Sequence, residues 1–153
     1  VNLAARRADA VITVSESAKA DIVRLYGIDP ARVHVVHEAA APGFSRVGDP
    51  GMLARVRARY GLAERFVLYV GTIEPRKNLP MLLEAFARHR QEGRLPHQLV
   101  CVGPYGWLSE DIGSRVDRLG LRDAVRFAGY VPFADLPAIY SLAEMFVFPS
   151  VYE

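Results

Sequence analysis

The residues best suited to chemistry in this sequence directly follow the apolar run 67–70. Gly71 and Thr72 come first after that run, and the basic pair Arg76 and Lys77 stands just before a predicted helix. Glycine allows an anion to approach the backbone closely, and the two cations can neutralise phosphate charge. The segment therefore predicts an anion site at the carboxyl end of a buried strand, where open α/β sheets hold their ligands. The alternative is that the basic pair only solvates the start of the helix, and spacing alone does not separate the two.

Turns of glycine and polar residues also follow the three later apolar runs. Glycines would again permit close backbone approach, an aromatic ring could stack on a base or a sugar, and a carboxylate could bind sugar hydroxyls. The second turn is equally well explained as a loop whose tryptophan covers the sheet edge, and a terminal glutamate is more often simply exposed to solvent. Four such strand ends nevertheless fit a ligand site better than any one does. These residues are Gly103 and Trp107 after the second run, Tyr130 and Val131 after the third, and Ser150 and Glu153 after the fourth.

Alternating strand and helix patterns position these turns. The apolar runs are continuous, which is typical of strands covered on both faces, so the fold class expected is α/β, a Rossmann-like parallel sheet wound by helices. Asn78 is predicted to cap the helix at 79–91, and Asp135 precedes the last helix. Strands are expected at 10–14, 33–36, 66–70, 99–102, 125–128 and 145–148, and helices from 15 or 17 to 26 and at 49–60, 79–91, 109–119 and 135–141.

The segment 38–51 lacks periodicity and is rich in alanine, glycine and proline, which predicts a linker between two domains. The predicted domains are 1–45 and 46–153. The sequence does not begin with methionine, and its last strand runs into a turn without a helix to cover it. We therefore expect a fragment truncated at both ends and inactive on its own.

The composition is that of an ordinary globular protein. The 153 residues are 51% hydrophobic and 24% charged, with a formal net charge of +2 and no block of like charge, so nucleic acid is not a predicted partner. Cys101, the single cysteine, lies in an apolar run and predicts a buried thiol in a reducing cytoplasm. No run approaches the roughly 18 apolar residues that span a bilayer.

Two other clusters suggest chemistry less strongly. His34, His37 and Glu38 could be metal ligands, but the two histidines fall on opposite faces of a strand, and no metal site is predicted. The arginines between 55 and 65 could touch an acidic membrane surface, although residues two apart diverge around a helix and a solvated face is the stronger interpretation. The G-x-G-x-x-G spacing of a dinucleotide site is absent.

The order and spacing of several segments resemble the retaining glycosyltransferases of family 4, the group 1 class with the GT-B fold. These segments are ADAVITVSESAKADI at 8–22, VGTIEPRKN at 70–78, VGPYGW at 102–107 and FAGYVPFADLPAIYSLAEMFVFPSVYE at 127–153. The resemblance implies that residues 1–45 end an acceptor-side domain with its crossover and that 46–153 begin a donor-binding domain. No cofactor is implied, because the donor substrate is a nucleotide sugar such as a GDP-, UDP- or ADP-sugar. No divalent metal is expected, because the basic loop can neutralise the diphosphate and no acidic motif such as Asp-x-Asp is present.

The resemblance also implies roles for single residues. Lys77 matches the lysine of the family's diphosphate-binding pair, the turn Gly129–Val131 matches the base-contacting segment, and Glu153 matches the first glutamate of a paired motif. Many relatives carry arginine directly after the glycine, where this chain has Thr72, which leaves Arg76 as the candidate second cation. The crossover 37–41 also departs from the common Asn-Gly-Val-Asp pattern.

The implied function is transfer of a sugar, with retention, from a nucleotide diphosphate sugar to a saccharide or lipid-linked acceptor in polysaccharide or glycolipid biosynthesis. The implied location is cytoplasmic, with a peripheral position at the inner face of the membrane as an option. Two alternatives stay open: a nucleotide-sugar epimerase of the same architecture, and a nucleotide-binding module without catalysis.

Overall fold

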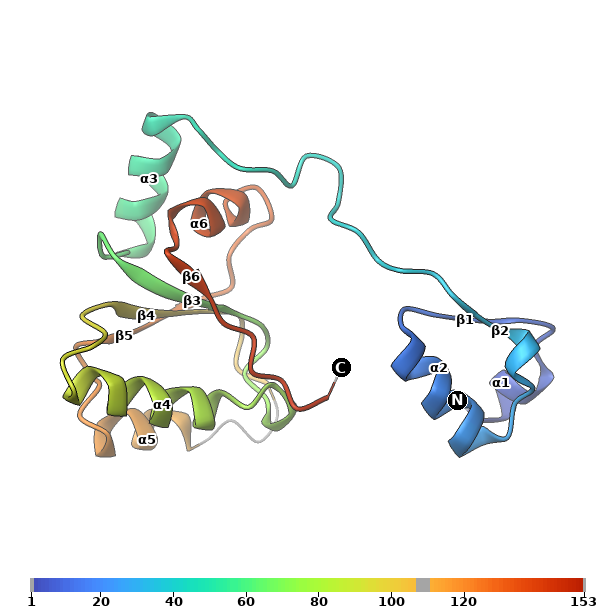
Figure 1. Cartoon of the computed structure of the whole chain (residues 1–153). Helices are drawn as coiled ribbons and strands as arrows, with labels where there is room; N and C mark the ends of the chain where they lie inside the picture. The colour runs from blue at the N-terminus through green and yellow to red at the C-terminus, as the bar shows by residue number, and fades with distance from the viewer. Residues whose placement is uncertain (1, 107–110, 153) are drawn as a thin grey trace. The chain divides into compact units, whose positions relative to one another are not determined.

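The computed structural model describes residues 2–106 and 111–152, and the chain divides into two compact units, Val1–Phe44 and Ser45–Glu153. In the first unit a parallel pair of strands is accompanied by helices (Figure 1). Ser15 caps α2, and Gly27 ends it in the left-handed conformation, which glycine adopts without a side-chain penalty. Its elements are α1 (Asn2–Arg7), β1 (Val11–Thr13), α2 (Glu16–Tyr26), η1 (Pro30–Arg32) and β2 (Val33–Val35).

The second unit is a parallel four-stranded sheet in the order β5-β4-β3-β6. Helices α4 and α5 lie on one face of the sheet and α3 and α6 on the other (Figure 1). Asp49 caps α3, and Gly61 ends it. The elements are α3 (Pro50–Tyr60), β3 (Phe66–Val70), η2 (Pro75–Lys77), α4 (Leu79–Gln91), β4 (Gln98–Val102), α5 (Ile112–Arg118), β5 (Val125–Gly129), α6 (Leu136–Leu142) and β6 (Met145–Phe146).

Alternate residues of the central strands enter two separate hydrophobic cores. Val67 and Tyr69 of β3 pack with residues of α4 and α5, whereas Phe66 and Leu68 pack with residues of α3 and α6. The expected doubly covered parallel sheet is therefore confirmed for β3 and β4. Cys101 lies in the first core as a free thiol, and burial raises its pKa to about 12.

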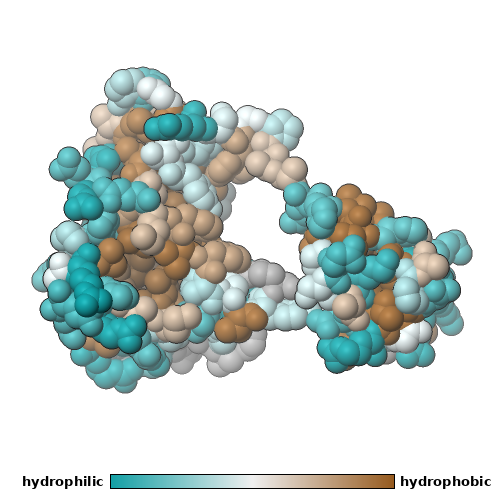
Figure 2. All heavy atoms as spheres, in the orientation of Figure 1, coloured by the Kyte–Doolittle hydropathy of each residue, from teal (hydrophilic) through white to brown (hydrophobic). Residues whose placement is uncertain are grey.

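The last strand differs from its prediction. β6 covers only Met145–Phe146 instead of 145–148, and these two residues are 52% and 47% exposed. Figure 2 shows hydrophobic side chains gathered across the middle of this unit, on the face where β6 lies in Figure 1. Within the described residues β6 pairs with β3 alone, through Val67 and Leu68, and this pairing limits the strand to two residues.

Helix boundaries differ from the predictions in smaller ways. The structure adds α1, which the sequence pattern did not indicate. α5 begins at Ile112 in the described residues, and the expected earlier start at 109 lies outside them. Asp135 stands at the start of α6 but makes no cap. Its carboxylate instead accepts hydrogen bonds from Tyr60, at 2.6 Å, and Arg59, at 3.1 Å, which ties α6 to α3.

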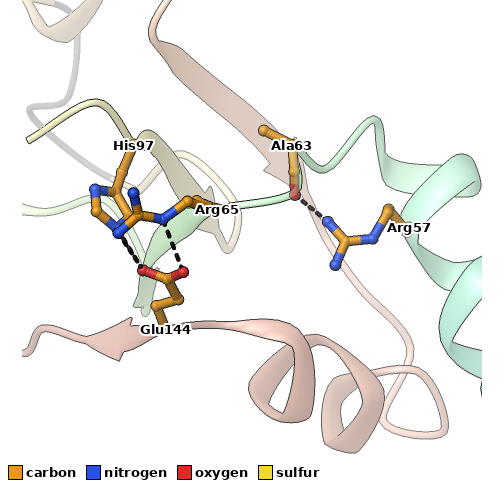
Figure 3. A network of polar contacts seen from close by, with 5 residues as sticks. All are labelled: Arg57, Ala63, Arg65, His97 and Glu144. Atoms are coloured by element: carbon orange, nitrogen blue, oxygen red, sulfur yellow. Dashed lines mark hydrogen bonds and ion pairs between the residues drawn. The ribbon is translucent and has the colours of Figure 1, made fainter.

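A polar cluster joins three strands at the amino end of the sheet (Figure 3). Glu144 precedes β6 and accepts hydrogen bonds from Arg65, before β3, at 2.9 Å and 3.2 Å. It also lies 2.5 Å from Nε2 of His97, which precedes β4 and is 8% exposed. Hydrogen bonds from Arg65 and then from His97 lower the pKa of Glu144 to about 2. The cluster therefore stabilises the end of the sheet opposite the predicted ligand site.

Replacing Glu144 by glutamine is expected to lower the melting temperature of the full-length protein near neutral pH. Because the folded state depresses the Glu144 pKa from 4.5 to about 2, the carboxylate stabilises fully above its ordinary pKa and progressively less as pH falls between these values. The melting-temperature difference between wild type and Glu144→Gln should therefore shrink over that interval. Glu64→Gln, at an exposed neighbouring position, is the matched control. A Glu144→Gln difference that stays constant with pH would contradict this role.

Candidate functional site

The loop between β3 and α4 holds the predicted basic pair. Lys77 is half-buried, and its Nζ lies 4.6 Å from the centroid of the Phe148 ring, an arrangement in which the ring face attracts the ammonium. Its aliphatic chain lies near Gly71, since a Cβ added to that glycine would stand 3.8 Å from Lys77 Cδ. The structure therefore brings Gly71 and Lys77 together at the carboxyl end of β3.

Arg76 is engaged within the protein. Its Nη2 lies 2.8 Å from a carboxylate oxygen of Glu74, and its Nη1 donates to the carbonyl of Tyr152 at 3.2 Å. The charge of Arg76 is thus partly balanced by Glu74. Its predicted role as a second diphosphate cation stays a prediction.

The loops after β3 and β4 continue to pair beyond the ends of the strands. Ile73 N donates to Pro104 O at 2.9 Å, and Gly106 N donates to Ile73 O at 3.0 Å. At Gly103, φ is 137°, and a Cβ would stand 2.7 Å from the carbonyl carbon of Gly71 and closer still to its oxygen. Gly103 was expected to admit a ligand, but in the structure its missing side chain admits the backbone of the neighbouring loop.

The turn after β5 places its two predicted residues in different surroundings. Gly103 N donates to Gly129 O at 2.8 Å, which attaches this turn to the end of β4. Tyr130 is 76% exposed, whereas Val131 is 4% exposed and belongs to the core beside α3 and α6. Only the backbone of Val131 is thus available to a ligand, while the Tyr130 ring is free of the core.

The chain after β6 lies against the basic loop. Val151 N donates to Arg76 O at 3.1 Å, and in Figure 1 this segment runs from β6 toward the start of α4. The sheet order explains the contact, because β4 and β5 extend from one side of β3 and β6 returns to the other, and ligands bind at such a switch point. Ser150 lies in this segment, and its buried Oγ has no hydrogen-bond partner among the described residues.

Most of the predicted site residues therefore lie at the carboxyl end of the sheet, on loops that are hydrogen-bonded to one another. Glu153 and Trp107 lie outside the described residues. Two contributors were missed: Phe148, whose ring contacts Lys77, and Asn78, whose side chain is hydrogen-bonded to the chain after β6. The only signals in the sequence were the aromatic residue just before Pro149 and the asparagine after the basic pair.

The two weaker candidates from the sequence were a metal site at His34, His37 and Glu38 and a basic surface made by the arginines between 55 and 65. Within residues 2–106 and 111–152 no group of three His, Cys, Asp or Glu side chains could hold a metal ion. Three arginines of the basic stretch bond within the second unit: Arg57 to the Ala63 carbonyl, Arg59 to Asp135 and Arg65 to Glu144. None of the helices in the described part of the chain has the length and apolarity to cross a bilayer.

Comparison with known families identifies the class. Residues 64–153 match the family model described as glycosyl transferases group 1, and residues 1–40 match the model of glycosyltransferase family 4. The chain belongs to the group 1 glycosyltransferases.

Curated relatives agree with this assignment. The O-antigen chain mannosyltransferase B of Escherichia coli is 35% identical over 145 residues, which cover 94% of this chain and 38% of that protein. The alpha-D-kanosaminyltransferase of Streptomyces kanamyceticus is 34% identical over 98% of this chain and 39% of its own length. The chain thus spans about two-fifths of the length of these relatives.

Solved structures share the fold. The sucrose-phosphate synthase of Thermosynechococcus elongatus superposes with a TM-score of 0.79 at 27% identity, over 99% of this chain and 37% of that one. HepE of Anabaena, in a crystal structure with UDP and glucose, superposes with a TM-score of 0.81 at 22% identity, over 98% of this chain and 40% of that one. The GT-B fold expected from the sequence is confirmed.

Proposed function

We propose that the full-length protein transfers a hexose, with retention of anomeric configuration, from a nucleotide diphosphate sugar to a hydroxyl of a saccharide or lipid-linked acceptor. The observation that carries the proposal is the position of Lys77 beside Gly71 at the topological switch point of a group 1 glycosyltransferase sheet. Group 1 membership supports transfer over epimerisation. Polysaccharide or glycolipid synthesis at the cytoplasmic face of a membrane is the proposed setting.

Each unit has a proposed part. Residues 1–45 would form the end of the acceptor-side domain and the crossover linker that leads to the donor-binding domain. Residues 46–153 would form the first part of the donor-binding domain. Lys77 and Arg76 would hold the diphosphate together with the turn of Gly71 and Thr72, while Gly103 fixes that turn. The Gly129–Val131 turn would contact the base, and Ser150 and Glu153 would face the donor sugar.

The chemistry makes charge at the diphosphate the central problem. The bond from the anomeric carbon to the diphosphate oxygen breaks, and its electron pair stays on that oxygen. The acceptor oxygen bonds to the anomeric carbon, and its proton passes to the released diphosphate. Negative charge thus develops on the diphosphate in the transition state. A fixed ammonium binds the diphosphate more tightly in the transition state than in the ground state, and this difference lowers the barrier.

Product analysis tests the proposal. The full-length protein is incubated with GDP-mannose, UDP-glucose or ADP-glucose, with and without a saccharide acceptor, and products are separated and their anomeric configuration is read by NMR. Mannose and glucose are chosen because a mannosyltransferase is among the relatives and the HepE crystals hold glucose. We expect an acceptor-dependent glycoside of the donor's configuration. An isomerised nucleotide sugar formed without acceptor, or an inverted product, would contradict the proposal.

A further inference from the structure

We propose that Asn78 is a positioning residue, whose side-chain amide holds the basic loop 74–78 against the chain that follows β6. The inference rests on the proposed function, because these two segments are the ones expected to hold the diphosphate and the donor sugar. Asn78 itself is not assigned a contact with substrate.

The backbone of Asn78 gives the first evidence. Asn78 has φ 55° and ψ 34°, and among the described residues it is the one non-glycine residue at positive φ. Glycine would adopt this left-handed conformation without a side-chain penalty, and asparagine tolerates it better than most residues do. The conformation therefore permits asparagine but does not require its amide.

Helix capping does not require the amide either. Asn78 occupies the N-cap position of α4, as predicted, but its side chain makes no cap hydrogen bond, which corrects the expectation from the sequence. By contrast, Ser15 and Asp49 both accept a hydrogen bond from the first turn of their helices. The Asn78 amide is used elsewhere.

The amide instead bridges two loops. Asn78 Nδ2 donates to the carbonyl of Pro149 at 3.3 Å. Two further bonds run between the same segments, from Val151 N to Arg76 O at 3.1 Å and from Arg76 Nη1 to Tyr152 O at 3.2 Å. Residues on both sides of Lys77 are therefore bonded to the chain after β6.

This arrangement fixes the lysine relative to its neighbours. With Arg76 and Asn78 both held, the ammonium of Lys77 keeps its place over the Phe148 ring, and Ser150 lies between the two bonded residues 149 and 151. Small displacements of a group that stabilises developing charge are costly in rate. Without the Asn78 amide, the basic loop would lose its hydrogen bond to the chain after β6 on one side of Lys77 and keep those of Arg76 on the other side.

Replacement by glycine separates positioning from folding. Asn78→Gly removes the amide and also removes the left-handed penalty, so the melting temperature should stay the same or rise. Loss of one hydrogen bond should nevertheless lower kcat/KM for the nucleotide sugar about 3- to 10-fold. The Asn78→Asp variant, which also lacks the side-chain N–H group, should show at least as large a loss of kcat/KM. A merely conformational role predicts that Asn78→Gly keeps the wild-type kcat/KM, which would overturn the proposal.

The matched control is a cap that only stabilises. Asp49→Ala removes the side-chain cap of α3 and should lower the melting temperature by a few degrees with kcat/KM unchanged. The opposite responses of Asp49→Ala and Asn78→Gly separate loss of stability from loss of positioning.

Amide hydrogen exchange gives a readout that needs no activity. In Asn78→Gly the protection of the Val151 amide should fall about 3- to 10-fold, while the amide of Cys101 in the centre of β4 should be unchanged. If the wild-type protein transfers no sugar, the proposed function fails and the exchange of Val151 still decides the role of Asn78. Unchanged Val151 protection would show that the amide does not hold the two loops together.

Discussion

Replacing Lys77 by alanine is expected to lower kcat of the full-length protein about 10²- to 10³-fold, the usual cost of one preorganised contact to developing charge. Lys77 is the cation held beside the Gly71 turn, and its neighbours on both sides are bonded to the chain after β6. Because the charge on the diphosphate grows in the transition state, the loss should fall mainly on kcat. Steady-state kinetics at saturating donor measure it.

Two controls make the Lys77 result specific. Lys77→Met removes the charge but keeps a long apolar chain, so a loss as large as that of Lys77→Ala would assign the effect to charge rather than to packing. Lys19→Ala changes the only other lysine of the chain and should leave kcat unchanged. Wild-type turnover in Lys77→Ala would remove Lys77 from the proposed mechanism.

Replacing Gly103 by alanine is expected to destabilise the second unit by about 3 kcal/mol or more. The change combines a strained positive φ with an overlap between the new Cβ and the backbone of Gly71. Relief of that overlap requires the β3 and β4 loops to separate, so donor affinity should fall together with stability. Calorimetric unfolding of the full-length protein and donor titration measure the two effects.

Gly113→Ala is the matched control for Gly103→Ala. Gly113 lies in α5, and a Cβ there would meet nothing within 4 Å. Alanine in a helix is favoured over glycine by about 0.5–1 kcal/mol, so this variant should be neutral or slightly more stable. An equal response of the two glycines would contradict the close approach between the loops at 71 and 103.

The central elements could be predicted from the sequence because local pattern and tertiary environment agree there. β3 and α4 have the bounds expected, since a run of buried apolar residues ends at Gly71 and Pro80 marks a first helical turn. β6 was predicted too long because the apolar run 145–148 shows hydrophobicity but not how many of its residues pair with a neighbouring strand, and in the described residues only two pair with β3. Strand pairing depends on sheet order, which the local pattern does not contain.

The candidate site was predictable to the level of strand ends and no further. Parallel topology alone places the turns at 71, 103, 129 and 149 at the same end of the sheet, where the strands finish. The contact of Asn78 with Pro149 depends on β6 lying next to β3, and the use of Gly103 for loop packing depends on the backbone path of its neighbour. Such long-range contacts are absent from residue type and spacing.

Calorimetric titration of the full-length protein with a nucleoside diphosphate and the matching monophosphate tests the central claim most directly. The affinities of GDP, UDP and ADP are each compared with the affinity of the corresponding nucleoside monophosphate. We predict that one diphosphate binds at least about 10-fold more tightly than its monophosphate, a difference of about 1.4 kcal/mol, and that Lys77→Ala abolishes most of this difference. Equal affinities for diphosphate and monophosphate, or a preference that survives in Lys77→Ala, would contradict a diphosphate site at this loop.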